Sequence, residues 1–123
     1  MPPGKTTRTT ILAFGLDAAL VVAFAATGRA SHGMDMFAGL WVTAWPFLVA
    51  LILGWVVALA WRAPFAPVRT GLPVWAITVA GGMLLRWANG QGVQPVFVFV
   101  TAALLLVLLV GWRLIATLIR RNR

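Results

Sequence analysis

The sequence predicts an all-α membrane protein, built as an up-down bundle of four transmembrane helices with both termini in the cytoplasm. Of its 123 residues, 62% are hydrophobic and only 10% are charged, with a mean hydropathy of +0.96. A soluble domain usually carries about 25% charged residues. The apolar residues form four long runs, and the basic residues gather at the ends of these runs. Both features favour insertion into a bilayer.

Each apolar run is interpreted as one helix. The runs cover residues 9–28, 37–61, 72–87 and 95–119. At about 1.5 Å per residue they cross a hydrocarbon core of about 30 Å, the third run only just. They lack the alternation of apolar and polar residues that marks β-strands. Short connections make neighbouring helices antiparallel, which gives the up-down bundle.

The polar segments divide the chain further. Residues 1–8 are expected to form a cytoplasmic tail, in which two prolines and a glycine argue against helix. Residues 9–119 form the single transmembrane domain, and residues 120–123 form a basic cytoplasmic tail. Residues 62–71 form a basic loop whose two prolines forbid a continuous helix between the second and third runs.

Orientation follows from the basic residues. With the N-terminus inside, eight of them lie on the cytoplasmic side and two on the other, as the positive-inside rule requires. The eight are Lys5, Arg8, Arg62, Arg69, Arg113, Arg120, Arg121 and Arg123, and the two are Arg29 and Arg86. We therefore expect a multi-pass protein of the plasma (inner) membrane, whose cytoplasmic face meets the anionic headgroups of the lipid bilayer.

The first run has a second interpretation, as a signal peptide cleaved after Ala23-Phe24-Ala25. Asp17 interrupts the apolar core that such a peptide needs, and the run is long enough to span the bilayer. We therefore interpret it as a retained helix.

Composition excludes several function classes. In a soluble protein, a formal charge of +8 would suggest binding to nucleic acid. Here the basic residues lie at the ends of the expected helices, so we do not expect the protein to bind nucleic acid. The absence of cysteine excludes disulfides, thiol catalysis and iron–sulfur ligation. The sequence has no Gly-rich phosphate loop, paired carboxylates or nucleophile motif. We expect no enzyme, no cofactor and no metal.

Asp17 is the most informative residue, because it lies about 12 Å inside the first helix at about 1.5 Å per residue. A carboxylate at that depth costs at least ~2.5–3.5 kcal/mol, so it should face the interior and have a partner. We expect Arg86 as this partner, with Gly82 one turn away allowing close helix approach, and Arg29 as the second candidate. Asp17 is then either a proton or cation site or half of a structural ion pair. A single carboxylate forms no relay, which favours the pair.

His32 is the single histidine and lies near Ser31 and Asp35 in the first outer connection. It suits a pH sensor or one metal ligand. One His and one Asp do not make a metal site, however, and neighbouring Ser and His residues do not make a hydrolase triad. We expect a loop histidine bonded to the backbone or to a headgroup.

Thr43 and Pro46 lie in the outer half of the second helix. Pro46 cannot donate to the carbonyl of Val42, so we expect a kink that leaves this acceptor free. The carbonyl can then accept from Arg29 or Arg86 or face a substrate cavity, although a kink that serves packing alone is the more common outcome. Small-residue patches at 81–82 and at 54–58 suit close packing, within the bundle or between the subunits of a homo-oligomer.

Several landmarks share an order and a spacing along nearly the whole chain. They are Asp17, Gly28-Arg29-x-x-His32, Thr43-Ala44-Trp45-Pro46-Phe47, Gly71, Trp75 and Gly82-Met83-x-x-Arg86, with Gly92 after them. In these landmarks the chain resembles a family of small bacterial and archaeal membrane proteins, domain of unknown function 3054. The resemblance implies a compact four-helix membrane protein with its polar landmarks around the outer half, and it supplies no activity.

The sequence thus predicts a polar cluster with two candidate roles. Its members are Asp17, Arg29, His32, Thr43, Pro46 and Arg86. The first role is a structural lock in a non-enzymatic accessory protein whose protein partner the sequence does not identify. The alternative is a small oligomeric transporter of ions or solutes, with Asp17 as its proton or cation site. An enzyme acting on a lipid or isoprenoid ranks third, since no catalytic constellation supports it.

Overall fold

The computed structural model describes residues 3–30, 36–90 and 94–121, and every regular element in these ranges is helical. The predicted all-α class is therefore confirmed for this part of the chain. The elements are α1 (Pro3–Ala30), α2 (Met36–Val57), the 3-10 turn η1 (Ala60–Arg62), the π-turn η2 (Pro67–Gly71), α3 (Leu72–Ala88), α4 (Pro95–Leu105), the π-turn η3 (Leu106–Val110) and α5 (Gly111–Arg121).

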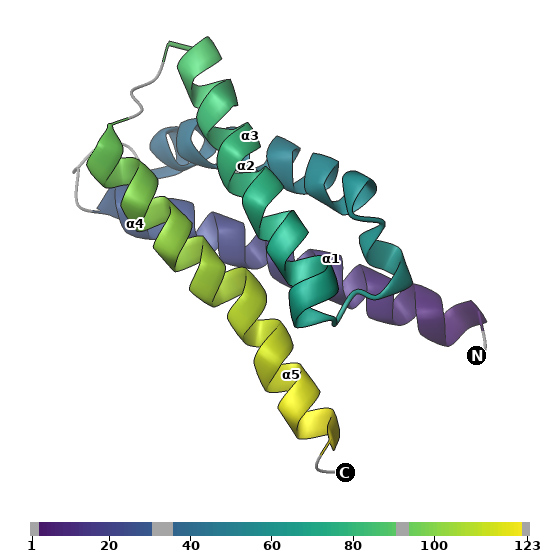
Figure 1. Ribbon diagram of the computed structural model, residues 1–123. Coiled ribbons are helices and arrows are strands. Elements are labelled where there is room, and N and C mark those ends of the chain that lie inside the picture. Colours follow the sequence, from purple (N-terminus) through teal and green to yellow (C-terminus); the bar gives the residue numbers. More distant parts are fainter. Residues whose placement is uncertain (1–2, 31–35, 91–93, 122–123) are drawn as a thin grey trace.

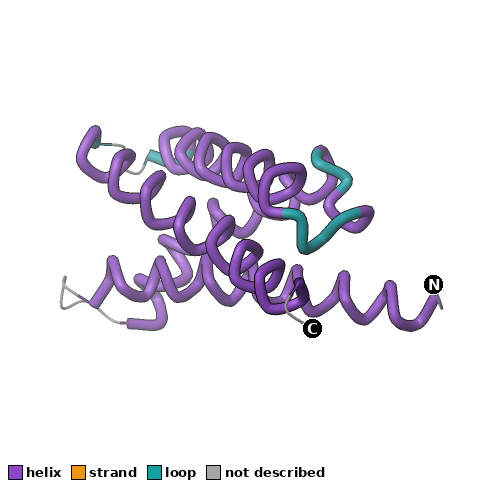
Figure 2. The backbone as a smooth tube through the Cα atoms, turned by 60° about the horizontal axis from the view of Figure 1, so that its bottom comes forward, coloured by secondary structure: helices purple, strands orange, loops and turns teal. Residues whose placement is uncertain are grey.

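The elements form four rods, because η2 continues into α3, and α4, η3 and α5 follow one another without a break. Successive rods run in opposite directions (Figure 1). The α2 helix packs most extensively on α3 and also on α1, while α4 packs on α3. The start of α1, the end of α5 and residues 58–66 lie toward one end of the molecule, opposite the last turns of α1 and α3 (Figure 2).

The start of α1 differs from the expectation of a non-helical tail over residues 1–8. The helix already begins at Pro3. Proline is tolerated in the first turn, because the N–H that it lacks has no partner within the helix there.

Two further boundaries differ around the connection between α2 and α3. The second apolar run extends to Trp61, but α2 ends at Val57. Two residues later Leu59 adopts the left-handed conformation with φ 52°, which ends an α-helix. At the other end of the connection, Pro67 begins η2, so the last five residues of the expected loop 62–71 belong to the third rod.

The distribution of side chains is that of a membrane protein. The segments Thr7–Ala26, Pro67–Ala88 and Pro95–Arg120 are long and apolar enough to cross a bilayer, and Trp41–Val57 of α2 is a shorter apolar helix. Large apolar side chains face outward, among them Phe99 at 74% exposure, while the charged side chain of Asp17 is fully buried. Apolar surface around a buried charge suits a lipid environment.

Three phenylalanines hold the helices together near the end of α3. Phe24 of α1, Phe47 of α2 and Phe97 of α4 have ring centroids 5.6–6.4 Å apart. Their tilted and edge-on contacts are the arrangements that aromatic rings prefer. A Cβ atom on Gly82 of α3 would overlap the Phe47 ring. The close approach of α3 to α2 therefore requires glycine at this position.

We expect Gly82→Ala to lower the free energy of unfolding by about 1–3 kcal/mol, because the added methyl forces Phe47 out of its position. Gly15→Ala is the matched control, since nothing lies within 4 Å of a Cβ there and alanine favours helix. Unfolding by SDS titration in mixed micelles measures both variants. Equal stability of the two variants would contradict the packing of α3 on α2.

Candidate functional site: a buried ion pair

The carboxylate of Asp17 lies midway along α1 and accepts four hydrogen bonds. Arg113 of α5 donates two of them, from Nη1 to Oδ1 at 3.0 Å and from Nη2 to Oδ2 at 2.7 Å. The indole Nε1 of Trp55 donates to Oδ2, and that of Trp112 donates to Oδ1, each at 2.8 Å. Each oxygen thus receives two donors, which fills the acceptor capacity of a carboxylate.

The Arg113 guanidinium is bound on its other sides as well. Its Nε donates to the carbonyl of Pro64 and its Nη1 to the carbonyl of Leu109, each at 2.8 Å. The guanidinium carbon lies 4.7 Å from the ring centroid of Trp112. The side chains of Arg113 and Asp17 are both 0% exposed. Charged groups at this burial are stable only when paired and hydrogen-bonded, as these are.

Local backbone features make room for the arginine. A Cβ atom on Gly71, the last residue of η2, would lie 3.3 Å from both Arg113 Cδ and Val110 Cγ2. This contact is tighter than side chains normally accept, so glycine lets the third rod approach the arginine. The π-turn η3 directly precedes α5 and contains Leu109, whose carbonyl accepts from Arg113. Such turns are rare and are frequent at functional sites.

Aromatic contacts extend the network to its surroundings. Trp55 packs edge-on against Phe14 of α1, with ring centroids 5.3 Å apart. Trp112 packs edge-on against Phe65 at 5.4 Å. The ion pair, these rings and Pro64 together join α1, α2, the 63–66 connection and α5. We call Asp17, Trp55, Trp112 and Arg113 the buried network.

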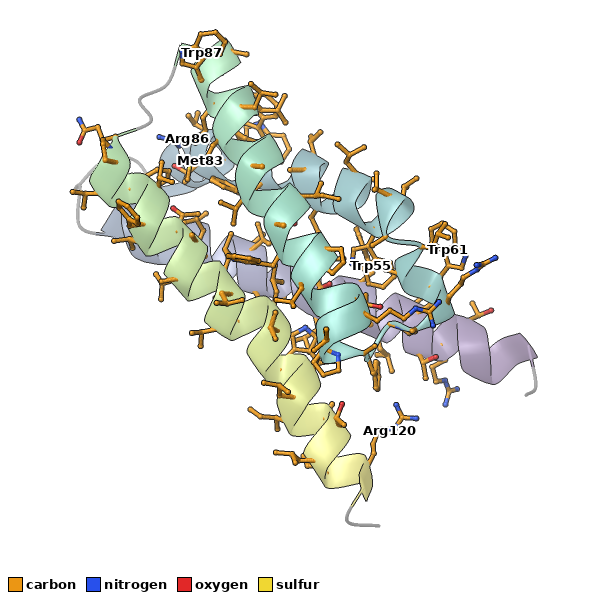
Figure 3. All side chains as sticks on the ribbon, in the orientation of Figure 1. Trp55, Trp61, Met83, Arg86, Trp87 and Arg120 are labelled. Carbon is orange, nitrogen blue, oxygen red and sulfur yellow. The ribbon has the colours of Figure 1, made fainter. Side chains whose placement is uncertain are left out.

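The predicted pairing of Asp17 with Arg86 is wrong, because Arg113 occupies that position. Arg86 lies near the end of α3, its guanidinium carbon 4.5 Å from the ring centroid of Phe97. Figure 3 shows Arg86 well away from Trp55, which marks the buried network. Arg113 lies at the same level along the helices as Asp17, whereas Arg86 does not. Because the side chain of aspartate is short, Asp17 pairs with the arginine at its own level.

The other predicted residues do not gather around Asp17. Thr43 and Pro46 are buried in α2, which continues through the proline. His32 and the side chain of Arg29 lie outside the described residues. Among the described members of the predicted cluster, Asp17 is therefore held in the buried network, and Arg86 lies elsewhere, against Phe97.

Arg113 was missed because it was counted only as a basic residue of the cytoplasmic side. A signal for its role exists in the sequence. It lies six residues before the end of the fourth run, and Asp17 lies eight residues after the start of the first. At about 1.5 Å per residue these depths are about 9 and 12 Å from the same membrane face. Matching the depths of charges within the runs selects Arg113 over Arg86.

The geometry of the buried network limits its chemistry. Both oxygens of Asp17 are saturated with donors, so the carboxylate offers no lone pair to a metal ion or to a substrate proton. Over the described ranges, His, Cys, Asp and Glu form no group of three or more that could hold a metal ion. The arrangement is that of a fixed, fully satisfied ion pair.

Comparison with known proteins agrees with the resemblance seen in the landmark residues. The model of a family described as "Protein of unknown function (DUF3054)" matches residues 14–116. This range includes all four residues of the buried network. Neither the curated proteins nor the solved structures contain a match to the chain.

A double-mutant cycle tests the pairing. Asp17→Ala should lower the free energy of unfolding by ~3–5 kcal/mol, because it leaves the Arg113 charge buried and unpaired. Adding Arg113→Leu to Asp17→Ala should then cost much less than the single changes predict together. Arg86→Leu combined with Asp17→Ala is the control and should be additive. Additivity for Arg113, or coupling for Arg86, would refute the assignment.

The indole donors give a second prediction. Trp112→Phe leaves a carboxylate oxygen short of a donor and should cost about 1.5–3 kcal/mol, as expected for a hydrogen bond to a charged group. Trp75→Phe is the matched control, because Trp75 is also half-buried and donates to the neutral carbonyl of Ala102 at 2.9 Å. Loss of this neutral hydrogen bond should lower the free energy of unfolding by about 0.5–1.5 kcal/mol. Thermal unfolding in detergent ranks the two variants, and the reverse order would contradict the role of Trp112.

Proposed function

This chain belongs to the family described as "Protein of unknown function (DUF3054)", and we propose that it is a non-enzymatic accessory protein of the cell membrane with the buried network as its structural lock. The observation that carries this proposal is the saturation of Asp17. All four of its hydrogen bonds come from side chains of the same protein, at 0% exposure. A group held in this way fixes helices in place and leaves no position open to a ligand.

The proposal includes four membrane spans with both termini in the cytoplasm. Three helices have the required length and hydropathy. The α2 helix has 22 uncharged residues, which at ~1.5 Å per residue extend about 33 Å. Arg62 belongs to η1 and Arg120 to the last turn of α5, and these two segments lie toward the end of the molecule where the described chain starts and ends (Figures 1 and 2). The positive-inside rule makes this the cytoplasmic end of an up-down bundle.

Nothing in the buried network favours the alternative, a transporter with Asp17 as its ion site. A cation at Asp17 would have to displace Arg113 or one of the indoles and would then face the guanidinium charge. A proton on the carboxylate would remove one charge of an ion pair whose side chains are both fully buried. A structural lock needs neither step.

The described residues also offer few side chains that could act as catalytic groups of an enzyme. Their buried polar side chains are Asp17, Thr43, Thr70, Thr78, Thr101 and Arg113. The Thr70 hydroxyl donates to the carbonyl of Ala63, and the hydroxyls of Thr78 and Thr101 have no hydrogen-bond partner among the described residues, so no carboxylate or histidine there activates these three as nucleophiles. An accessory role requires a membrane-embedded partner or a second copy of the chain, and the exposed apolar faces of the helices offer surface for either.

Ion flux is the direct test of this function. Proteoliposomes that contain the wild-type protein should take up protons, alkali cations and small anions no faster than empty vesicles do. Asp17→Asn should lower the melting temperature, because Arg113 loses its countercharge. A wild-type flux that Asp17→Asn abolishes without loss of fold would replace the accessory role with transport.

Reporter fusions test the topology independently of function. A reporter that is active only in the cytoplasm should work after Arg123 and between Pro64 and Pro67, and it should be silent at Asn89. These positions follow from the four spans and from the positive-inside rule. Activity at Asn89 would reverse the orientation, and activity at all three positions would reduce the number of spans.

A further inference from the structure

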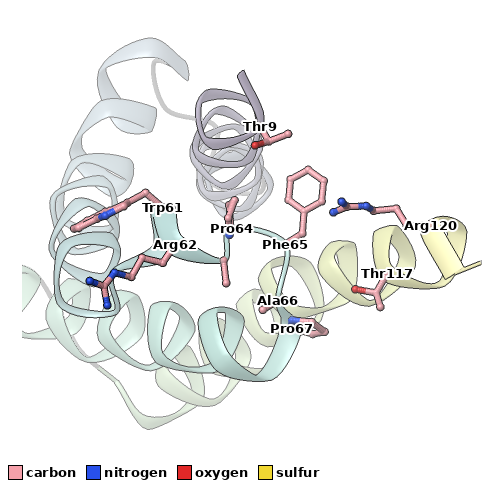
Figure 4. A pocket seen from close by; sticks show the side chains of 10 residues that line it. Thr9, Trp61, Arg62, Pro64, Phe65, Ala66, Pro67, Thr117 and Arg120 are labelled. Carbon is pink, nitrogen blue, oxygen red and sulfur yellow. The ribbon is translucent and has the colours of Figure 1, made fainter. Parts of the chain in front are cut away.

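A pocket of about 480 Å³ opens beside the buried network, at the end of the molecule that holds the start of α1 (Figure 4). Its walls come from residues 61–67, from α1 and from α5. The lining residues are Thr9, Trp61, Arg62, Ala63, Pro64, Phe65, Ala66, Pro67, Thr117 and Arg120. Most of this surface is aromatic, proline or alanine, and its polar side-chain groups are the hydroxyls of Thr9 and Thr117, the guanidinium groups of Arg62 and Arg120, and the indole N–H of Trp61.

The charges around the pocket have one sign. Arg62 and Arg120 lie on opposite sides of it, with Pro64 and Phe65 between them (Figure 4). Among the described residues that line the pocket there is no carboxylate. The chain has two acidic residues in all, and one of them, Asp17, is fully engaged by the buried network. An anion in the pocket therefore meets no repelling charge from these lining residues.

The pocket walls are fixed by hydrogen bonds to buried groups. Thr70 Oγ1 donates to the carbonyl of Ala63 at 2.6 Å, and Arg113 Nε donates to the carbonyl of Pro64 at 2.8 Å. Phe65 packs on Trp112 on one side, and the Arg120 guanidinium carbon lies 5.0 Å from its ring centroid on another. The site is thus preorganised, which reduces the entropy lost when a ligand binds.

We propose that this pocket binds the phosphate-bearing headgroup of an anionic phospholipid. Arg62 and Arg120 supply charged donors for phosphate oxygens. The apolar walls, including Trp61 at 43% exposure, suit the glycerol and upper acyl region that a soluble phosphate lacks. The lipid belongs to the leaflet at the end of the molecule that carries these arginines. This inference needs a membrane location but does not depend on the accessory role.

Occupancy of the pocket should stabilise the fold. A ligand that binds the folded state alone raises the melting temperature. Here the ligand would rest on Pro64 and Phe65, which contact Arg113 and Trp112 directly. Lipid bound in the pocket would therefore support the same residues that hold Asp17.

Native mass spectrometry of the detergent-purified full-length protein tests the proposal with phosphatidylglycerol, phosphatidylcholine and soluble glycerol 3-phosphate. Phosphatidylglycerol should bind best and should raise the melting temperature. Each arginine removed in Arg62→Gln and Arg120→Gln should weaken its binding roughly fivefold. Arg69→Gln is the matched control, since Arg69 is an exposed arginine of the neighbouring η2 that does not line the pocket.

Three results would overturn the lipid site. If phosphatidylcholine bound as tightly as phosphatidylglycerol, the net charge of the headgroup would have no role in binding. A loss in Arg69→Gln as large as in the pocket variants would indicate diffuse surface attraction. Equally tight binding of glycerol 3-phosphate would assign the pocket to a soluble phosphate. Arg62→Gln leaves the contact between Arg120 and Phe65 intact, so it keeps the test decisive if Arg120→Gln lowers the stability of the fold.

Discussion

The ion pair between Asp17 and Arg113 is the interaction on which the rest of the structure depends. Two charges at zero exposure are tolerated only if every hydrogen-bonding direction is filled. That requirement brings an indole from α2, a second indole from α5 and carbonyl groups of Pro64 and Leu109 to a single place. The position along the helices at which α1, α2 and α5 meet is therefore fixed by the need to pair these two charges. Glycine is needed at position 71 because a Cβ atom there would press against the arginine side chain.

The two ends of the molecule are held by different forces. At one end the contacts are directional hydrogen bonds to a carboxylate. At the other they are ring contacts among Phe24, Phe47 and Phe97, with Gly82 allowing close approach. In lipid, apolar side chains gain little by leaving their solvent, so helix association relies on close packing and polar contacts. One end of this protein uses mainly close packing, and the other uses mainly polar contacts.

Much of the fold was predictable, because hydropathy averages over about twenty residues and tolerates local irregularity. The need of Asp17 for a basic partner was predictable as well, since a charge at that depth has no other stable state. The identity of the partner was not recognised, because Arg113 was assigned to the group that sets orientation. Trp55 and Trp112 were missed as donors because an indole in an apolar run has the same sequence pattern whether or not its N–H is bonded. The left-handed Leu59 and the two π-turns leave no mark in composition or periodicity, so their positions came only from the structure.

The π-turn η3 makes the spacing between α4 and α5 consequential for how the family can change. Each residue inserted or removed in a helix rotates everything beyond it by about 100°. A π-turn holds one residue more than a regular turn, so loss of a single residue between 106 and 110 would convert η3 into a regular turn and leave Trp112 and Arg113 on their present face of the rod. Loss of a residue from the regular α4 helix would instead turn both side chains away from Asp17. Length polymorphism should thus be better tolerated at η3 than in α4, where each individual residue is replaceable but their number is not.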